Sequence, residues 1–595
     1  MKSFAANWCR KTFGCFVMMV TLWCCAVMAQ TPTTSNPTPT TSPTPTTGTP
    51  EVDGTVPTGV TQGVTNVFDP GPRPAGTANI RFIGGTSPCK GVPDVVEPAG
   101  PAGPGAGDVV NNITANETGF WFAALAVFGT TATVKPATDP LTCGPSIVGL
   151  GPGFNGESCF QCHSQPTIGG SSPASNPQIT AAHDKGATNV IPSFISSNGP
   201  VLEARFVFNA DGTLDGGVHE LFSIQGRSDA TGCTFAQPDF QTQLTNNNII
   251  FRIPIPTFGE GFVENTSELN LETNLASLTS TKSSLGINGR FNRSGNDSTI
   301  TRFGWKAQNK SLLMFAGEAA NVEMGVTNEL FGNEKFPNTV SHATGCDFNP
   351  TPEDFTNPDA TVTGTPNPTA DPKASDIENF TVFMRFNAPP QQCDYHSGTD
   401  SNGNALCKAL SAEAANGKAI FGTLTQTTVN GVLQPPKIGI GCVLCHSDVL
   451  NTGSDSPFNG SNVNAAAFTD ANFAPFSDFA LHHMGATLTD GVNQGLAGPD
   501  EFRTAPLWGL GQRLFFMHDG HDTSIVQAIL DHETASSSCT TINTPGETFI
   551  LNGQTKTLTS QTQHFCGSEA NAVIGKFKAL TVSQQQDLMD FLRSL

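Results

Sequence analysis

The chain has 595 residues, of which 50 are acidic and 29 are basic, so its formal net charge is −21 at pH 7. This balance argues against nucleic acid as a partner, because nucleic-acid binding depends on basic side chains that neutralise phosphates. Single hydrophobic cores rarely grow beyond about 250 to 300 residues, so the length predicts more than one domain. The negative field would attract a cationic protein partner, and it would equally keep the protein in solution.

The first 29 residues have the pattern of a secretory signal peptide. Lys2, Arg10 and Lys11 supply a positive region, the apolar run FGCFVMMVTLWCCAVMA follows, and Ala29 provides a small-residue cleavage site. We therefore expect residues 1–29 to be removed and the mature protein to be periplasmic or otherwise exported. The alternative is a retained membrane anchor, although the apolar run is shorter than the roughly 20 residues that span a bilayer. No later segment approaches a membrane span.

Residues 30–64 have the composition of a disordered linker. The stretch TPTTSNPTPTTSPTPTTGTP alternates Thr with Pro and contains almost no apolar residue, so it cannot build a core and should be extended. After this linker, many clusters of Gly, Pro, Asn and Thr predict short helices that are joined by long loops.

The pattern CxxCH occurs twice, as CFQCH at 159–163 and as CVLCH at 442–446. Two thiols three positions apart on one helical turn can add to the two vinyl groups of one haem, and the next histidine then lies below the iron. A single match could be a zinc half-site or a redox cysteine pair. Two matches in an exported chain favour two covalently bound c-type haems. We expect attachment at Cys159, Cys162, Cys442 and Cys445, with His163 and His446 as the proximal iron ligands.

Three stretches carry helical signals. SDIENFTVFMRF (375–386) ends before two prolines, SAEAANGKAIFG (411–422) leads to the second CxxCH motif, and LTVSQQQDLMDFLRSL (580–595) has apolar residues at helical spacing. Each CxxCH motif is thus followed, much later, by one amphipathic helix. We expect two similar haem domains, residues 65–407 with a large insertion and residues 408–595.

Cysteine usage also fits export. Of the 16 cysteines, four lie in the predicted signal peptide and four in the two motifs, which leaves eight. An even number suits disulfide bonds in an oxidising compartment. The sequence leaves the connectivity open, and the nearest pairs are Cys89 with Cys143, Cys393 with Cys407, and Cys539 with Cys566.

Five longer stretches around these motifs are also informative: GPGFNGESCFQCH, GVHELFSIQGRSDATGC, RFGWKAQNKSLLMFAGEAANVEMGVTNELF, FSDFALHHMG and EFRTAPLWGLGQRLFFMHDGHDTSIVQAILDH. They resemble a known family, the di-haem oxidoreductases, which are also called thiol oxidoreductases and are related to bacterial di-haem cytochrome c peroxidases and MauG. The resemblance covers about residues 75–595. It implies a mainly α fold with two cytochrome c-like domains and short β insertions. It also implies that one haem meets peroxide while the other relays electrons.

The resemblance suggests how the second haem is ligated. In the peroxidase relatives, the sixth iron ligand is often a Met that lies 14 residues beyond the His of an FHDG segment. Here MHDG places that His at 518, and position 532 is a histidine, so we expect a bis-His haem held by His446 and His532. A strong second ligand favours electron transfer. The alternatives are a helix-capping role for His532, and Met484 or Met517 as the ligand.

The first haem should keep an open or water-bound sixth position, which favours substrate chemistry. Between residues 164 and 300 the only histidines are His183 and His219. His219 lies in a family-like motif and is the alternative distal ligand. With an open position, His163 alone would hold the iron.

Peroxide cleavage needs a group that takes a proton from one oxygen and gives it to the other, and a carboxylate over the iron can do both. In the peroxidase relatives, this group is the Glu of an EMG motif, some 20 residues after a Trp that lies between the haems. Here VEMG places Glu323 18 residues after Trp305. We therefore expect Glu323 to be the catalytic acid and Trp305 the relay. The alternatives are a solvated or capping Glu323 and Glu264 as a reserve acid.

Oxidisable aromatic residues are scarce. Trp305 is one of three tryptophans in the predicted mature chain, which also has one tyrosine, while the full chain has 42 phenylalanines. Because an oxidising haem oxidises Trp and Tyr more easily than Phe, we hypothesise that this composition leaves few sites for stray oxidation. Lineage drift in aromatic usage is the alternative explanation.

The expected function is reduction of hydrogen peroxide at the His163 haem, with electrons that arrive from a redox partner such as a small cytochrome through the His446 haem. Calcium is a candidate further cofactor, because RTAPLWG (503–509) resembles a segment that gives backbone ligands to calcium in relatives. Three alternatives remain open: an oxygenase of the rubber-cleaving type, a MauG-like enzyme that oxidises a partner protein, and an electron-transfer cytochrome without enzymatic activity.

Overall fold

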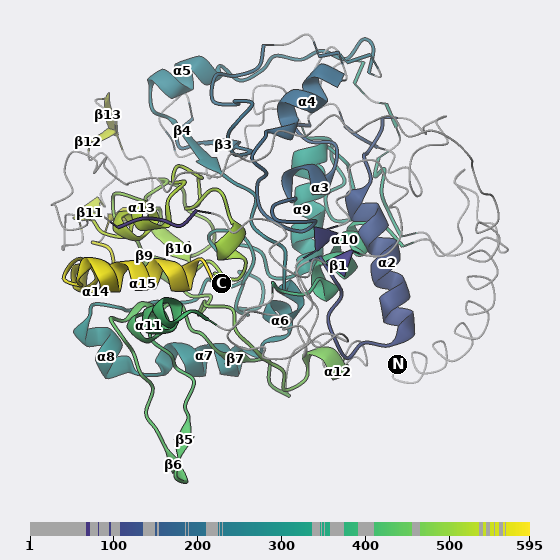
Figure 1. Cartoon of the computed structure of the whole chain (residues 1–595). Helices are drawn as coiled ribbons and strands as arrows, with labels where there is room; N and C mark the ends of the chain where they lie inside the picture. Colours follow the sequence, from purple (N-terminus) through teal and green to yellow (C-terminus); the bar gives the residue numbers. More distant parts are fainter. Residues whose placement is uncertain are drawn as a thin grey trace, which may run out of the picture. The chain divides into compact units, whose positions relative to one another are not determined.

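The structure is a computed structural model of the whole chain (Figure 1). It describes residues 67–71, 81–82, 95–96, 107–134, 149–151, 154–184, 186–187, 190–209, 213, 224, 227–228, 230–335, 345–346, 348–349, 351–356, 374–390, 410–454, 465–534, 540–542, 548–551, 554–557, 563–565 and 567–595. The predicted signal peptide and linker, His219 and six of the eight remaining cysteines lie outside these ranges.

The first helical group consists of α2 (Ala115–Gly129), α9 (Leu312–Met324) and α10 (Asp376–Phe386), which lie side by side (Figure 1). A capping box starts α10, because Ser375 accepts the backbone N–H of Glu378 and the Glu378 carboxylate accepts that of Ser375. The predicted helix over 375–386 is therefore confirmed. Large aromatic rings fill the contact between α2 and α10.

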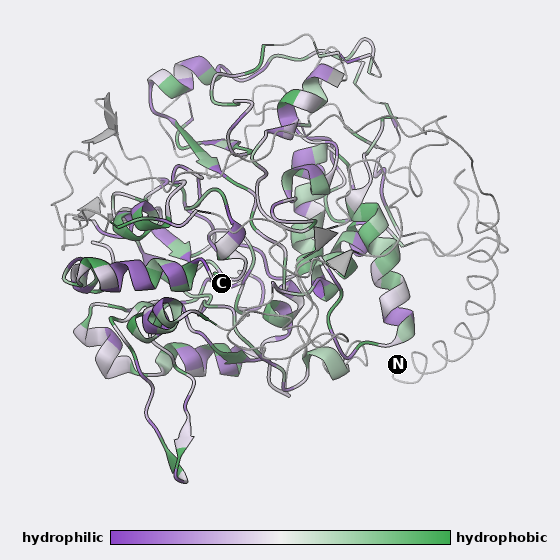
Figure 2. Ribbon diagram, in the orientation of Figure 1, coloured by the Kyte–Doolittle hydropathy of each residue, from purple (hydrophilic) through white to green (hydrophobic). Residues whose placement is uncertain are grey.

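The second helical group surrounds the second CxxCH motif. It contains α11 (Ala412–Phe421), the 3₁₀ turn η1 (Cys442–Leu444), α13 (Ile525–Asp531), α14 (Asn571–Lys578) and α15 (Val582–Leu592). The helices predicted over 411–422 and 580–595 are confirmed as α11 and α15, which pack against each other. In Figure 2, α15 carries both hydrophobic and hydrophilic residues along its length, as expected for an amphipathic helix.

Shorter helices connect these groups. They are α3 (Cys159–Cys162), α4 (Pro177–Asp184), α5 (Phe240–Thr245), α6 (Glu260–Asn265), α7 (Glu268–Ala276), α8 (Thr279–Ser284), α12 (Ala465–Phe468) and η3 (Leu510–Gln512). Their shortness agrees with the high density of turn-forming residues in the sequence.

All strands of the described residues belong to antiparallel pairs. The pairs are β1 (Arg81–Phe82) with β2 (Val95–Val96), β3 (Glu203–Phe206) with β4 (Ile249–Arg252), β5 (Thr428–Val429) with β6 (Val432–Leu433), β7 (Leu450–Asn451) with β8 (Asn472–Phe473), β9 (Leu481–His483) with β10 (Glu501–Arg503), β11 (Thr540–Ile542) with β14 (Gln563–Phe565), and β12 (Thr548–Leu551) with β13 (Gln554–Thr557). The fold is thus helix-rich but mixed, and two separate cytochrome c-like folds are not evident in it. The boundary predicted at residue 407 stays a prediction.

Two further features bear on the sequence predictions. Cys233 and Cys346 form a disulfide bond, whereas the three pairs nearest in sequence lie outside the described residues. Among the described helices, none combines the length and the apolar character that crossing a bilayer requires.

Candidate functional site

The first CxxCH motif forms a single helical turn, α3, at the wall of a cavity. The cavity has a volume of about 1160 Å³, counted with its open mouth, and Cys159, Cys162 and His163 all line it. Both cysteines are free thiols. Burial raises the pKa of the Cys159 thiol to about 12, and it raises that of Cys162 as well. Such buried, protonated thiols are poor redox partners, which weakens the interpretation as a redox cysteine pair.

His163 is oriented by backbone hydrogen bonds. Its Nδ1 lies 3.1 Å from the carbonyl oxygen of Gly170 and donates to it. The backbone of Ile255 is a second hydrogen-bond partner of the ring. Removal from water lowers the pKa of His163 to about 4, so the ring is neutral at neutral pH. Gly170 is required here, since a Cβ atom at this position would lie 2.0 Å from the carbonyl oxygen of Gln165.

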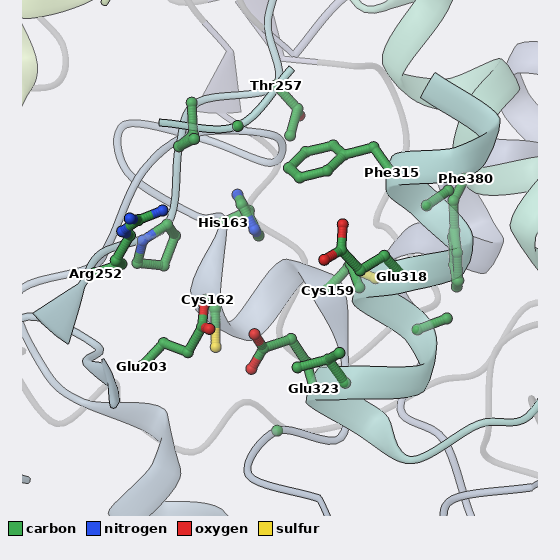
Figure 3. Close-up of a pocket in the computed structure, with 18 of the residues that line it drawn as sticks. Cys159, Cys162, His163, Glu203, Arg252, Thr257, Phe315, Glu318, Glu323 and Phe380 are labelled. Atoms are coloured by element: carbon green, nitrogen blue, oxygen red, sulfur yellow. The ribbon is translucent and has the colours of Figure 1, made fainter. Parts of the chain in front are cut away.

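Glu323 occupies the last turn of α9 and points into the same cavity (Figure 3). Its own carbonyl oxygen accepts the backbone N–H groups of Asn155 and Gly156, 3.0 and 3.2 Å away, which lie just before the first CxxCH motif. The end of α9 is therefore fixed against the loop that precedes the first CxxCH motif. Removal from water raises the pKa of the Glu323 carboxyl to about 7, and a hydrogen bond from Asn155 opposes this rise.

Further charged groups face the first cavity that were not predicted from the sequence. Glu318 points into it from α9, one and a half turns before Glu323, and Glu203, Arg205 and Arg252 line it from β3 and β4 (Figure 3). Asn309 donates a hydrogen bond to Oε2 of Glu318. No sequence signal marked these residues, because β3 and β4 join the cavity through contacts distant in the sequence.

The reserve acid, Glu264, has a structural role. Its side chain is 1% exposed, and its Oε2 accepts a hydrogen bond from Nε of Arg385 at 2.7 Å. Its Oε1 accepts the backbone N–H of Leu312 at 3.0 Å, at the start of α9. Glu264 does not belong to the lining of either large cavity. The two acids that were considered are thus separated by the fold, and only Glu323 faces the first cavity.

Among the described lining residues of the first cavity, His163 is the only histidine. His183 lies exposed on α4 and does not reach the cavity. His219 is outside the described residues. The open sixth position at the first site therefore stays a prediction.

The second CxxCH motif lies on η1, at the wall of a cavity of about 1470 Å³, again counted with its mouth. Cys442, Cys445, His446 and His532 line it. The Nδ1 atom of His446 lies 2.9 Å from the carbonyl oxygen of Phe476, which repeats the arrangement of His163. His446 also has its pKa lowered to about 4, by removal from water and by the nearby His532.

His532 ends α13 and faces His446. Its Nδ1 donates to the carbonyl oxygen of Ala528, 2.6 Å away, so this residue caps the helix and still presents Nε2 to the cavity. The centroids of the two rings are 6.5 Å apart. When two imidazoles bind one metal ion from opposite sides, their ring centroids lie about 6 Å apart, because each metal–nitrogen bond is about 2 Å long. Met484 and Met517 line the same cavity, so the structure brings all three candidate ligands together.

Four further histidines of this region, all among those whose side chains the structure describes, have other partners. His482 is buried between Asp478 and Glu569, at 3.0 and 2.7 Å, which occupy both of its ring nitrogens. His518 stacks on Phe502 with ring centroids 4.4 Å apart. The others are His483, which pairs with Asp500, and His521, which is exposed and pairs with Asp519 and Asp531.

Trp305 lines both cavities and is therefore the described residue that joins them. Its side chain is 9% exposed, and its Nε1 donates to the carbonyl oxygen of Ile253 at 3.0 Å. Its carbonyl oxygen accepts the backbone N–H of Arg503 at 2.9 Å. The sequence predicted a Trp between two haem sites, and the structure places Trp305 between the two CxxCH cavities.

The second cavity also contains buried guanidinium groups. Nη1 of Arg503 is buried and makes no hydrogen bond, although Nε of this residue donates to Gly304. Arg513 lines the cavity as well, and burial lowers its pKa to about 10. Cationic groups of this kind fit the carboxylates of a haem. Arg513 has a sequence signal, because it is the charged residue inside the apolar run LWGLGQRLFF.

Backbone ligands for calcium were expected in the segment 503–509. Some carbonyl oxygens of this segment already accept hydrogen bonds from other residues of the protein. The carbonyl of Thr504 accepts a hydrogen bond from the Ser477 hydroxyl at 2.6 Å, and that of Leu507 accepts the backbone N–H of Leu510. Calcium at this segment stays a prediction.

Comparison with known families gives one match. Residues 431–541 match the family model described as "Di-haem oxidoreductase, putative peroxidase". This region contains the second CxxCH motif, the MHDG segment and His532. We found no match to the chain among curated proteins or among solved structures. Over residues 431–541, this match supports the family predicted from the sequence motifs, and this region is similar to the di-haem oxidoreductases.

Proposed function

We propose that this protein is an exported di-haem c-type oxidoreductase that reduces hydrogen peroxide to water. The observation that carries the proposal is the difference between the two CxxCH cavities. The first combines one histidine with the buried carboxyl group of Glu323. The second combines two facing histidines, and Trp305 lines both cavities. One site is thus built for proton transfer to a small substrate and the other for electron transfer.

The side chains present fit two haem groups. Cys159 and Cys162 would hold the first, with His163 as the iron ligand. Cys442, Cys445, His446 and His532 would hold the second, and the buried Nη1 of Arg503, which makes no hydrogen bond, would suit its carboxylates. When bound, the haems would supply the one-electron redox chemistry that the reduction of peroxide requires.

Glu323 moves the protons of the reaction. Reduction of hydrogen peroxide takes up two electrons and two protons and yields two water molecules. With a pKa of about 7, the Glu323 carboxyl is present in both protonation states near neutral pH. As a carboxylate it accepts the proton of the near peroxide oxygen, and as the acid it returns that proton to the leaving oxygen. The same group therefore serves both steps.

Trp305 provides the route for electrons between the two sites. Trp305 lines both cavities, its indole N–H donates to Ile253, and its backbone carbonyl accepts the N–H of Arg503. We propose that a cationic redox protein such as a small cytochrome delivers the electrons, because the chain carries a net charge of −21. Export through the predicted signal peptide would place the enzyme where it meets this donor.

The retained Glu323 favours peroxide chemistry over an oxygenase of the rubber-cleaving type. An electron-transfer cytochrome without enzymatic activity would instead need two saturated irons. Electron paramagnetic resonance and absorption spectra of the isolated and half-reduced holoprotein separate these functions. We expect one low-spin and one accessible site, together with peroxide turnover supported by an artificial donor. Two low-spin sites in every redox state, without turnover, would contradict the proposal.

A further inference from the structure

The ammonium group of Lys306 lies inside a cage of oxygen atoms. Four oxygens surround its Nζ atom at 2.7 to 3.1 Å: the carbonyl oxygens of Gly498, Pro499 and Glu501, and Oδ1 of Asp490. The side chains of Lys306 and Asp490 are both fully buried. Three N–H donors are thus shared among three backbone carbonyls and one carboxylate, away from water.

A cage of this composition differs from an ordinary buried ion pair. Taking an ammonium and a carboxylate out of water costs several kcal/mol each, so such a pair contributes little net stability. Here, however, three of the four oxygens are backbone carbonyls of residues 498–501, which converge on one point. Convergent carbonyls and a carboxylate are the ligands with which proteins bind hard metal cations. Without a positive charge at the centre, these carbonyl dipoles would repel one another.

The cage is joined to Trp305 from both sides. Lys306 is the next residue in the chain, and Asp490 also pairs through Oδ2 with Arg252. Arg252 in turn precedes Ile253, whose carbonyl oxygen accepts the indole N–H of Trp305. Asp490 therefore connects two cations, of which Lys306 directly follows Trp305 and Arg252 directly precedes the residue that accepts the indole N–H.

The cage also reaches the second cavity. Nζ of Lys306 lies 4.1 Å from the centre of the Phe502 ring, which stacks on His518, and both rings line that cavity. On the other side, Arg252 lines the first cavity. Lys306 and Arg252, which Asp490 joins, thus lie between the two cavities, as Trp305 does.

We propose that Lys306 is a tethered cation, which occupies an oxygen cage in the manner of a bound metal ion and thereby holds Trp305 in position between the two cavities. The cage is a cation site whose natural occupant is the chain's own ammonium group. Lys306 acts through Trp305, so it is a positioning residue. This part of the inference rests on the proposed relay role of Trp305, whereas the cation site itself does not.

Chemical rescue tests the inference on the holoprotein. Lys306→Ala removes three carbons and the ammonium group, which together have the size of propylammonium. We expect this variant to unfold at a lower temperature and to transfer electrons between the haems about 100-fold more slowly, the cost of misplacing a reacting group by about 1 Å. Propylammonium should restore both quantities, whereas tetramethylammonium, which cannot donate hydrogen bonds, should restore neither.

Lys310→Ala is the matched control, because Lys310 belongs to the same loop but is exposed and pairs with Asp297. It should leave the thermal midpoint and the transfer rate unchanged, with or without propylammonium. A folded Lys306→Ala protein that does not respond to propylammonium in either quantity would overturn the inference.

A second variant covers the case in which Lys306→Ala does not fold. Asp490→Asn keeps an oxygen in the cage but removes its charge, so it should lower the midpoint and the transfer rate as well. Wild-type values in this variant would overturn the inference. Failure of the relay is distinguishable: an unchanged rate in Trp305→Phe would refute the relay, while restoration of the Lys306→Ala midpoint by propylammonium would still support the cation site.

Discussion

The imidazole rings of His446 and His532 face each other across the second cavity, with centroids 6.5 Å apart and planes inclined by 59°. They come from different walls, since His446 follows η1 and His532 ends α13. Each ring donates its Nδ1 proton to a backbone carbonyl, which orients its Nε2 atom toward the other ring. Such backbone partners fix the tautomer and direction of metal-binding histidines. This arrangement supports the proposal that the pair binds one iron from both sides.

Substitution of His532 tests this pair directly. In His532→Ala we expect the low-spin signal of the second haem to become high-spin, because one strong ligand is lost. In His532→Met we expect a raised midpoint potential, by on the order of 0.1 V within the roughly 0.8 V over which axial ligands tune haem. Spectroelectrochemical titration measures both effects. Met517→Leu is the matched control, and a loss of the low-spin signal there would assign the ligand to Met517 instead.

Substitution of Glu323 tests the proton transfer. Glu323→Gln keeps the size of the side chain but cannot accept a proton, so kcat with peroxide should fall by about 10² to 10⁴-fold. The absorption spectrum should stay that of the wild type. Glu264→Gln is the comparison acid, and it should lower stability through its Arg385 contact while kcat remains high in the folded fraction. Equal turnover in Glu323→Gln and the wild type would refute the assigned role.

The pH dependence follows from the raised pKa of Glu323. The first proton transfer needs the carboxylate, and the pKa of this group in the folded protein is about 7, above the ordinary 4.5. The rate of the peroxide step should therefore decline as the pH falls through about 7, and this decline should be absent from the residual rate of Glu323→Gln. Steady-state kcat/KM measured between pH 5 and 9, a window of about two pH units on either side of the pKa, provides the test. A wild-type decline centred near the ordinary pKa would contradict the burial of this carboxyl group.

Local patterns account for what could be predicted from the sequence. The helix over 376–386 has a visible S-x-x-E capping box, and α15 has T-x-x-Q, so both helices carry their start signals in four residues. The CxxCH motifs and the spacing from His518 to His532 are equally local. Glu264 and Glu323 looked alike in sequence because nothing local shows which of them faces a cavity. Glu264 is instead held by Arg385, a hydrogen-bond partner that lies 121 residues later in the sequence.

The unpredicted parts depend on residues that are distant in sequence. Lys306 meets its carbonyl partners across about 190 positions, and Arg252 meets Asp490 across 238. Backbone carbonyls leave no side-chain pattern, so a cage made mostly of them has no sequence signature. In the sequence, Lys306 is marked only by its place directly after Trp305 in GWKAQ, and this order does not show that the lysine is buried.

The relay role of Trp305 predicts a specific kinetic defect. Trp305→Phe keeps an aromatic ring but removes the hydrogen bond to Ile253 and the easily oxidised indole. We expect electron transfer between the two haems to slow, while the spectra of both haems stay unchanged. Rapid-mixing absorption measurements on the half-reduced holoprotein follow this transfer. Trp508→Phe is the control, because Trp508 is equally buried but lines neither cavity. An equal rate in both variants and the wild type would remove Trp305 from the path.

The first described segment is anchored to the C-terminal helix by a buried ion pair. Asp69 accepts two hydrogen bonds from Arg593, from Nε at 2.6 Å and from Nη2 at 2.7 Å, and both side chains are nearly excluded from solvent. Asp69 also accepts the first backbone N–H of α13, from Ile525, so it links the α15 end to the helix that carries His532.

Asp69→Ala should therefore lower the free energy of unfolding by about 3 to 5 kcal/mol, because it leaves the Arg593 charge buried without its partner. Denaturant unfolding followed by circular dichroism measures this loss. Asp297→Ala removes the exposed partner of Lys310 and should lower the free energy of unfolding much less, because solvent screens exposed ion pairs. If the two variants lose the same small amount, the Asp69 segment does not hold the second helical group, and the orientation of His532 must depend on the contacts of α13 with α15 alone.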